Sequence, residues 1–136
     1  MDTLTPEKRS WNMSRIRSRD TNPEKVVRSL LHSMGYRFRL HVRTLPGAPD
    51  VVLPKYHTVV LVNGCFWHRH ANCKFAYMPK TRTQFWQRKF EQNVARQSKV
   101  NAELEEMGWH VVTIWECELS DRVSLSQRLS ESLPKA

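Results

Sequence analysis

Residues 50–62 read DVVLPKYHTVVLV, two apolar runs separated by a Pro-Lys-Tyr-His turn. Both runs are rich in β-branched residues, which favour strands, and the turn is short enough to make the two strands neighbours. We therefore expect Asp50–Leu53 and Thr58–Val62 to be adjacent central strands of a sheet. If they pair as a hairpin, Asp50 lies beside residues 62–63 at one end of that sheet.

On the amino-terminal side of this hairpin, a helix is expected to begin at Thr21. This threonine can cap the helix, Pro23 falls in its first turn, and Glu24 stands three residues after the cap, where its side chain can bond back to the backbone. Apolar residues then recur at helical spacing until Gly35, which favours a helix end. Residues 1–20 carry many basic residues around few apolar ones, and we predict that they form a basic arm outside the core.

Hydrophobic periodicity predicts the other elements. A half-buried strand, a long helix, a buried strand and a weaker amphipathic helix are expected at residues 36–42, 82–107, 110–115 and 121–134. In the long helix, the side chains expected to face inward are Phe85, Trp86, Phe90, Val94, Leu104 and Met107. This order of elements predicts an α/β fold in which a central mixed sheet is flanked by helices, formed by a single domain at residues 21–136.

The charge of the chain is strongly positive: 22 Lys and Arg residues against 13 Asp and Glu residues give a formal net charge of +9. A basic surface of this kind is typical of proteins that bind nucleic acid. No run approaches the ~18 consecutive apolar residues of a membrane-spanning helix, and the amino terminus lacks the pattern of a signal peptide, so membrane and exported proteins are disfavoured. The three cysteines cannot all pair within one chain, and in a cytoplasmic protein they would be reduced and available as metal ligands.

Cysteines and histidines gather in NGCFWHRHANC (residues 63–73), which follows the second strand of the hairpin. Together with a cysteine directly after the strand at 110–115, the metal-ligand candidates are Cys65, His68, His70, Cys73 and Cys117. Structural zinc prefers four tetrahedral nitrogen or sulfur ligands, and the spacing allows either His68 or His70 as the imidazole that joins the thiols. A Cys2His2 finger is disfavoured, because no second local ligand pair and helix follow at the required spacing.

Asp50 follows a proline-containing loop at the end of the predicted sheet that also carries the histidine run. One carboxylate, a backbone carbonyl and phosphate oxygens can hold Mg2+, which assists phosphodiester cleavage, and a nearby imidazole such as His68 can accept or donate the proton. Glu24 has two interpretations. It is a helix cap, which its position favours, or a carboxylate that faces the sheet end and holds water at the metal.

Several separate motifs resemble the very-short-patch-repair (Vsr) mismatch endonucleases, over residues 8–120. They are Pro49-Asp50, Asn63-Gly-Cys-Phe-Trp-His68, Thr81-Arg-Thr-x-Phe-Trp86, Lys89, Asn93, Gly108-Trp109 and Trp115-Glu-Cys117. The resemblance implies a variant of the restriction-endonuclease-like (PD-(D/E)XK) fold. It also implies a bacterial enzyme that nicks one strand of DNA beside a T·G mismatch, the product of 5-methylcytosine deamination, and so initiates very-short-patch repair. Such an enzyme would be a monomer in the cytoplasm, associated with the nucleoid and functionally linked to a cytosine-5 methyltransferase and a repair polymerase.

The resemblance also implies roles for residues at the sheet end. Asp50 would bind the catalytic Mg2+ together with the Val62 carbonyl, and His68 would be the catalytic imidazole. Glu24 would orient water or the amino-terminal segment, and Asn63 would occupy a catalytic position where many members carry a second histidine. The ligands of a structural Zn2+ would be Cys65, His70, Cys73 and Cys117.

A further group of residues would contact DNA. The resemblance implies an aromatic wedge beside the mismatch, contacts to the mismatched bases from one helix face, and a basic arm on the other side of the duplex. The residues concerned are Phe66, Trp67 and Trp86 for the wedge, Lys89 and Asn93 for the helix face, and Met13, Arg15 and Arg19 for the arm. Apolar wedges open a mismatched base step at lower cost than a paired one, so wedging itself favours damaged DNA. The residues alone leave open that the rings only cover the zinc site and that Trp86 belongs to the core.

Two positions depart from the family pattern. Asn63 replaces a histidine and cannot titrate, although its amide can hydrogen-bond water at the metal. Gln97 stands where an aspartate would partner the catalytic histidine, and an amide can orient the ring of His68 without supplying a full charge. We expect cleavage to persist with a weaker base.

Three other functions fit part of these features. A sequence-specific restriction-type nuclease of the same fold would share the catalytic residues but needs no wedge, since it reads base edges. A catalytically weak, zinc-stabilised protein that binds mismatches would not need Asp50. An RNA-binding zinc module would fit the charge but leaves Asp50 and His68 without a purpose.

Overall fold

The computed structural model describes residues 21–135, so the predicted arm at residues 1–20, with Met13, Arg15 and Arg19, lies outside the described part of the chain. The described helices are α2 (Asn22–Ser33), α3 (Thr83–Glu106) and α4 (Arg122–Ser132). The strands are β1 (Arg39–Leu40), β2 (Val51–Leu53), β3 (Thr58–Asn63) and β4 (His110–Trp115), and short 3-10 turns occupy Pro54–Tyr56 and Glu116–Ser120. The predicted helices, the hairpin strands and the strand after the long helix are confirmed, with ends that differ by at most two residues.

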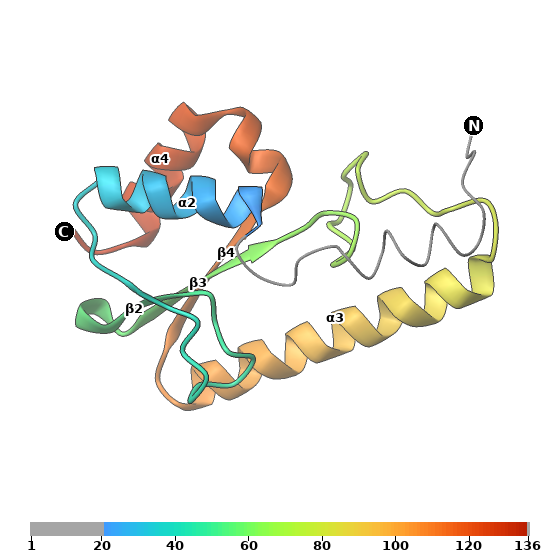
Figure 1. Ribbon diagram of the computed structural model, residues 1–136, viewed down its shortest axis with the longest axis horizontal. Coiled ribbons are helices and arrows are strands. Elements are labelled where there is room, and N and C mark those ends of the chain that lie inside the picture. Colours follow the sequence, from blue (N-terminus) through green and yellow to red (C-terminus); the bar gives the residue numbers. More distant parts are fainter. Residues whose placement is uncertain (1–20, 136) are drawn as a thin grey trace.

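The sheet has the order β1-β2-β3-β4 and is mixed. The pairs β1/β2 and β2/β3 are antiparallel, and Val51 lies opposite Val60 in the hairpin that the sequence predicts. Strands β3 and β4 are parallel, with Asn63 opposite Trp115. A parallel pair needs a crossover connection, which α3 supplies. Figure 1 shows α3 on one side of the sheet and the helices α2 and α4 on the other.

Alternation along the strands divides the apolar side chains between the two faces of the sheet. Val51 and Leu53 of β2 belong to the core beneath α2 and α4, which also contains Leu129. Val52, which lies between them, belongs to the core on the opposite face, together with Leu104 of α3. Both faces of the sheet are therefore covered by helices, as the order of elements predicts.

The prediction of a strand over residues 36–42 is wrong in its extent, because β1 is only Arg39–Leu40 and both residues are exposed. His41 has a φ of 51°, in the left-handed region, and therefore interrupts the extended conformation. Tyr36 is buried, and its hydroxyl donates to the carbonyl oxygen of Pro134. The side chain of Tyr36 thus holds the start of this segment, where the prediction placed hydrogen bonds between strands.

Helix α3 buries fewer side chains than its pattern predicts. Phe90 and Leu104 are buried, but Phe85, Val94 and Met107 are 40%, 41% and 50% exposed. For Phe85, in the first turn of α3, Figure 1 gives the reason, since the helix is longer than the sheet and its amino-terminal part projects past the strands. Met107 directly follows the last residue of α3, at its carboxyl-terminal cap. Only the carboxyl-terminal part of α3 covers the sheet.

Gly47, in the loop before β2, has a φ of 74° and no room for a side chain. A Cβ atom there would lie 2.7 Å from Cγ1 of Val100, on α3. Val100 is β-branched and has few rotamers to escape into. We expect Gly47→Ala to lower the free energy of unfolding by about 2–3 kcal/mol, through backbone strain and overpacking, as measured by urea denaturation.

Gly64→Ala is the matched control for this substitution. The atoms nearest to a Cβ at Gly64 are 3.5 Å away, which is ordinary van der Waals contact. We expect this variant to differ from the parent by less than about 0.5 kcal/mol. Equal losses of stability in the two variants would contradict the steric argument.

Candidate active site and metal centre

The strand ends bring the predicted catalytic residues to one edge of the sheet. Extending the β2/β3 register by one pair places Asp50 opposite Leu61, two residues before β3 ends at Asn63. Strand β4 ends beside Asn63, at Trp115. The loop that carries His68 leaves from this edge as well, because it follows β3 directly.

Asp50 is held by two residues that the sequence pattern did not single out. The Nη2 of Arg28, on α2, donates to Oδ1 and Oδ2 of Asp50 at 2.8 and 2.9 Å. The Nδ1 of His41 lies 2.9 Å from Oδ1. The sequence related Arg28 to the predicted site only through its spacing from Glu24. The two residues are four apart and therefore lie on one face of the helix.

Glu24 is a helix cap, as its position favours. Its Oε2 accepts a hydrogen bond from the backbone N–H of Thr21 at 3.0 Å, and its own N–H donates to Oγ1 of Thr21 at 3.4 Å, which completes a capping box. The same Oε2 lies 3.8 Å from Nη2 of Arg28. The cap is therefore part of a charged cluster, formed by Glu24, Arg28, His41 and Asp50.

His68 lies in the loop after β3, where its backbone N–H donates to the carbonyl of Gly64 at 3.1 Å. Its Nδ1 is buried and has no hydrogen-bond partner within residues 21–135. Burial, and after it the positive charge of Arg96, lowers the pKa of the imidazole. The ring is therefore neutral near pH 7 and able to accept a proton.

Gln97 does not orient His68 through this nitrogen, contrary to the expectation from its position. The Nε2 of Gln97 donates to Oδ1 of Asn101 at 2.8 Å. Residues four apart on a helix are neighbours, so the amide finds a partner on its own helix. Within residues 21–135, the Nδ1 of His68 therefore has no hydrogen-bond partner from Gln97 or from any other residue.

The four predicted zinc ligands come together in the structure. The ligand atoms of Cys65, His70, Cys73 and Cys117 lie within 4.8 Å of one another and could hold a metal ion. Spacing alone left open whether His68 or His70 is the imidazole ligand. His70 is the one in the cluster, because its Nδ1 is 3.6 Å from Sγ of Cys65 and 3.4 Å from Sγ of Cys117. Tetrahedral bonds of ~2.3 Å to sulfur and ~2.0 Å to nitrogen separate these atoms by about 3.5 Å, so the spacing fits a zinc-sized ion.

The surroundings of this metal-ligand cluster also suit a cation. Burial raises the pKa of the Cys65 thiol to about 12, so the thiolate requires a positive charge beside it. The backbone N–H of Cys117 donates to Sγ of Cys65 at 3.4 Å. The ring of His70 stacks on Trp115 with centroids 4.1 Å apart, which fixes its orientation.

The predicted wedge residues belong to a cluster of aromatic rings. Phe66 lies at its centre, with ring centroids 5.1 Å from those of Trp67, Tyr77 and Phe90 and 5.6 Å from that of Trp86. Trp86 is half-buried and belongs to neither of the cores of the sheet. The rings therefore join the loop after β3 to the projecting part of α3.

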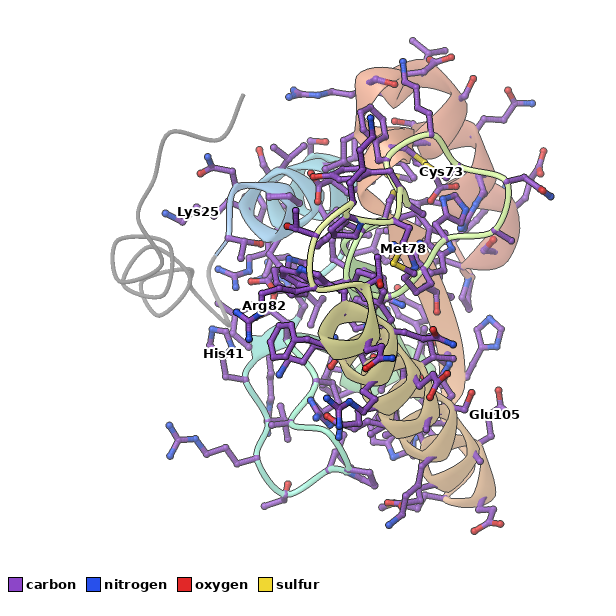
Figure 2. The ribbon with its side chains drawn as sticks, turned by 90° about the vertical axis from the view of Figure 1, so that its right-hand side faces the viewer. Lys25, His41, Cys73, Met78, Arg82 and Glu105 are labelled. Atoms are coloured by element: carbon purple, nitrogen blue, oxygen red, sulfur yellow. The ribbon has the colours of Figure 1, made fainter. Side chains whose placement is uncertain are left out.

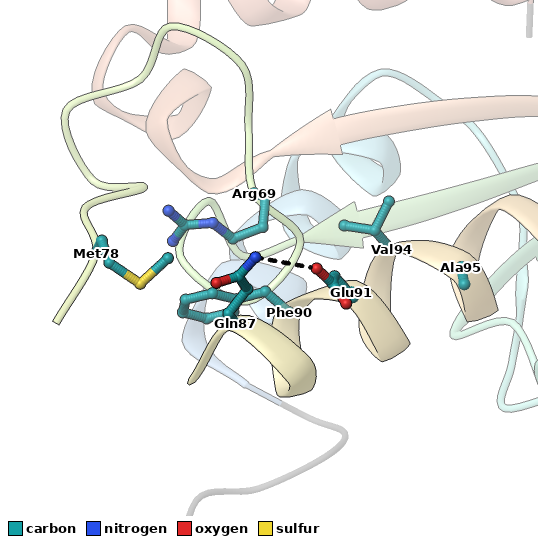
Figure 3. A pocket seen from close by; sticks show the side chains of 7 residues that line it. All are labelled: Arg69, Met78, Gln87, Phe90, Glu91, Val94 and Ala95. Carbon is teal, nitrogen blue, oxygen red and sulfur yellow. Dashed lines mark hydrogen bonds between the residues drawn. The ribbon is translucent and has the colours of Figure 1, made fainter. Parts of the chain in front are cut away.

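Arg69 holds the far half of this loop. Its guanidinium donates to the carbonyl oxygens of Ala76 and Tyr77 at 2.8 and 2.9 Å, and lies 4.0 Å from the centroid of the Phe90 ring. Figure 3 shows Arg69 above Phe90, with Met78 nearby, in the wall of a pocket of about 340 Å3 between the loop and α3. The sequence pattern gave no signal for this role, because the partners of Arg69 are backbone atoms.

Polar side chains of α3 lie next to the aromatic cluster. The Nδ2 of Asn93 donates to the carbonyl of Trp67 at 3.4 Å, and Lys89, one turn earlier, is exposed. Figure 2, viewed close to the axis of α3, shows Arg82 beside the start of the helix and the loop with Cys73 above it. Of the residues expected to contact DNA, those within residues 21–135 therefore lie on the loop after β3 and on the amino-terminal half of α3.

The family model for the DNA mismatch endonuclease Vsr matches residues 1–74. The chain belongs to the Vsr family. The type II nicking enzyme V.XorIIP of Xanthomonas oryzae pv. oryzae is 50% identical to it, over 97% of this chain and 96% of the relative. The type II nicking enzyme V.NmeAIP of Neisseria meningitidis serogroup A is 42% identical, over 95% and 91% of the two chains. The DNA mismatch endonuclease Vsr of Escherichia coli (strain K12) is 44% identical, over 92% and 80%.

As a member of the Vsr family, the chain is a DNA endonuclease, and the resemblance inferred from its motifs is confirmed. The family match includes the segment from Asp50 to His70, and the relatives extend the similarity over nearly the whole chain. Among residues 21–135, no helix has the length and apolar character needed to cross a membrane.

Proposed function

We propose that this Vsr-family endonuclease nicks one strand of duplex DNA beside a T·G mismatch, by Mg2+-dependent hydrolysis of a phosphodiester bond. The observation that carries the proposal is the edge of the sheet where Asp50, Asn63 and the loop with His68 meet, next to the aromatic cluster. The E. coli relative is named as a DNA mismatch endonuclease, which supports the substrate class. The mismatch would arise by deamination of 5-methylcytosine, and the nick would initiate very-short-patch repair.

Asp50 is the carboxylate proposed to hold Mg2+, with the carbonyl oxygen of Val62 as a second ligand. Within residues 21–135, the groups of three or more His, Cys, Asp or Glu side chains that could hold a metal do not include Asp50. Mg2+ usually keeps several waters and binds through one or two carboxylates plus substrate phosphates, so a single carboxylate at a DNA-binding edge fits this ion. When bound, Mg2+ supplies polarisation of the phosphate and offsets the charge on the leaving oxygen.

His68 is the group proposed to transfer the proton during hydrolysis. Its Nδ1 is buried and unpaired within the described residues, so the imidazole is not committed to a structural hydrogen bond through that atom. Asn63, buried at the end of β3, would hold a water molecule through its amide. Glu24 would act indirectly, by capping α2 and orienting the amino-terminal segment.

Zn2+ is the metal proposed for the cluster of Cys65, His70, Cys73 and Cys117. Thiolate and imidazole ligands select zinc among the common divalent ions. Four protein ligands leave no open position for substrate or water, so the role of this ion would be structural. Its effect would be to fix the loop that carries His68 and the aromatic rings.

The aromatic cluster is proposed to open the base step beside the mismatch. Phe66, Trp67 and Trp86 would form the wedge, held in position by the contact of Arg69 with Phe90. A wedge that is ordered before it meets DNA spends no binding energy on its own ordering. The residues proposed to approach the mismatched bases and to clasp the duplex from the other side are Lys89, Asn93, Met13, Arg15 and Arg19.

The remaining assignments rest on membership of the family. Residues 21–136 would form one domain with a variant of the restriction-endonuclease-like PD-(D/E)XK fold, preceded by a basic arm at residues 1–20. The enzyme would act as a monomer on one strand, in the cytoplasm and associated with the nucleoid. It would work with a cytosine-5 methyltransferase, whose product creates the mismatch, and with a repair polymerase.

A library of labelled T·G duplexes with varied flanking bases tests this function. In the presence of Mg2+ we expect a nick in one strand beside the mismatch, at a rate at least about 100-fold above that on the matched homoduplex. Mapping of the labelled products by sequencing gels gives the strand and the sequence context. Cleavage of homoduplex DNA alone would favour a restriction-type nuclease, and tight binding without any product would favour a mismatch-binding protein.

A further inference from the structure

The positively charged group that faces Asp50 in this structure is the guanidinium of Arg28. The Nη2 atom of Arg28 lies 2.8 Å from Oδ1 and 2.9 Å from Oδ2. An atom nearly equidistant from both carboxylate oxygens sits close to the bisector of the carboxylate. A divalent cation bound by both oxygens would lie near the same bisector, closer to the oxygens, at about 2.3–2.6 Å for Ca2+.

The surroundings of Arg28 make this position strongly charged and only partly hydrated. The side chains of Arg28 and Asp50 are 14% and 13% exposed, and that of His41, whose Nδ1 lies 2.9 Å from Oδ1, is 23% exposed. The Oε2 of Glu24 lies 3.8 Å from the same Nη2. One guanidinium nitrogen is thus placed between two carboxylates, where water screens charges less than at an open surface.

We propose that Arg28 competes with the catalytic divalent cation for Asp50 and keeps the affinity for that cation low until DNA binds. This inference rests on the proposed function of Asp50. A guanidinium and a divalent cation repel each other and cannot both occupy the bisector. Arg28 is a positioning residue in this scheme, because it acts through the carboxylate and takes no part in bond cleavage.

Binding of DNA would allow the divalent cation to replace Arg28 at Asp50. A phosphate group accepts two hydrogen bonds from a guanidinium and can also supply oxygen ligands to a divalent cation. When the backbone of the duplex reaches the sheet edge, Arg28 therefore has a new partner and the cation has additional ligands. The endonuclease assembles its cation site on its substrate, and without DNA its carboxylate stays neutralised.

Binding of Ca2+ to the full-length, zinc-loaded protein without DNA tests the competition. Ca2+ is a hard cation that takes oxygen ligands, and its affinity is measured by isothermal titration calorimetry without reference to nicking. We expect Arg28→Gln to bind Ca2+ on the order of tenfold more tightly than the parent, because one positive charge leaves the cluster. Arg28→Lys, which keeps that charge, should stay within about threefold of the parent. The matched control is Arg37→Gln, an exposed arginine outside the cluster, which should change nothing.

Arg28→Met, which also removes the charge but keeps an apolar stem, is measured in parallel in case Arg28→Gln does not fold. Addition of Asp50→Asn to either variant should abolish the gain in affinity. An unchanged or weaker affinity for Ca2+ in the charge-removing variants overturns the inference, and so does a gain that survives Asp50→Asn. A failure of the proposed function is seen separately, as absence of Mg2+-dependent nicking by the parent protein.

Discussion

Asp50→Asn is expected to slow nicking of a T·G duplex by about 10³-fold, with the affinity for the duplex within about threefold of the parent. Asparagine keeps the shape of the side chain and one oxygen that can accept from Arg28, which donates to Asp50 at 2.8 Å. It loses the charge that would hold a hard cation at the sheet edge. Single-turnover rates at saturating enzyme separate the chemical step from binding, which fluorescence anisotropy measures independently.

The matched control is Asp121→Asn, at the start of α4. Oδ1 of Asp121 accepts a hydrogen bond from the backbone N–H of Ser124 at 3.1 Å, and asparagine caps helices as well as aspartate does. This variant should nick at the parental rate. If Asp50→Asn did so too, Asp50 would have no place in the mechanism and the reaction would have to be assigned elsewhere.

His70→Ala and His68→Ala are expected to fail in opposite ways, although the two histidines are two residues apart. His70 contributes Nδ1 to the metal-ligand cluster, 3.4 Å from Sγ of Cys117, and its ring stacks on Trp115. Its loss should reduce bound zinc from about one ion per chain to a small fraction and lower the Tm by about 10 °C, since metal binding contributes to folding. Metal content by mass spectrometry and thermal unfolding by circular dichroism give both numbers.

His68→Ala should keep its zinc and a Tm within about 2 °C of the parent, because His68 is outside the metal-ligand cluster. Its nicking rate should fall by about 100-fold or more, as is typical for loss of an acid–base group. Loss of zinc from the His68 variant, or retention of zinc by the His70 variant, would show that the fourth ligand has been assigned to the wrong histidine.

The hairpin and the metal-ligand cluster could be predicted because each depends on short-range patterns. The turn between residues 53 and 58 fixes the register, and the register carries Asp50 to the edge where β3 ends. The run from Cys65 to Cys73 supplies most of the ligands within one loop. Cys117 could be added because it follows a predicted strand, and that strand proves to lie parallel to β3.

The contact between Arg28 and Asp50 could not be predicted, because it depends on how α2 packs against the sheet. Arg28 is 22 residues from Asp50 in the sequence, and an arginine on a helix face is most often exposed to solvent. His41 lies opposite Asp50 just after β1, where its backbone N–H donates to the carbonyl of Asp50 at 3.0 Å. The predicted strand over residues 36–42 gave no reason to place its side chain on that carboxylate. No pattern of apolar residues encodes either contact.

The amphipathic pattern of α3 also led to a wrong prediction of which side chains are buried, for a geometric reason. Periodicity identifies the face of a helix but says nothing about the length of the sheet beneath it. Phe85 and Val94 repeat at the spacing of a buried face, yet both are exposed. The amino-terminal part of α3 projects past the strands (Figure 1). There α3 packs through Trp86 and Phe90 against Phe66, whose loop no periodicity describes.

Helix α3 rests on two different supports, with Leu104 in the core of the sheet and Trp86 against the rings of the loop. Amide protons along this one helix should therefore exchange with deuterated solvent at graded rates, slowest near Leu104, where exchange requires global unfolding. Near Trp86 the amide protons should exchange whenever the loop after β3 separates from α3. The stability of the part of α3 proposed to face DNA would thus depend on the loop after β3, while the part of the helix over the sheet would not depend on it.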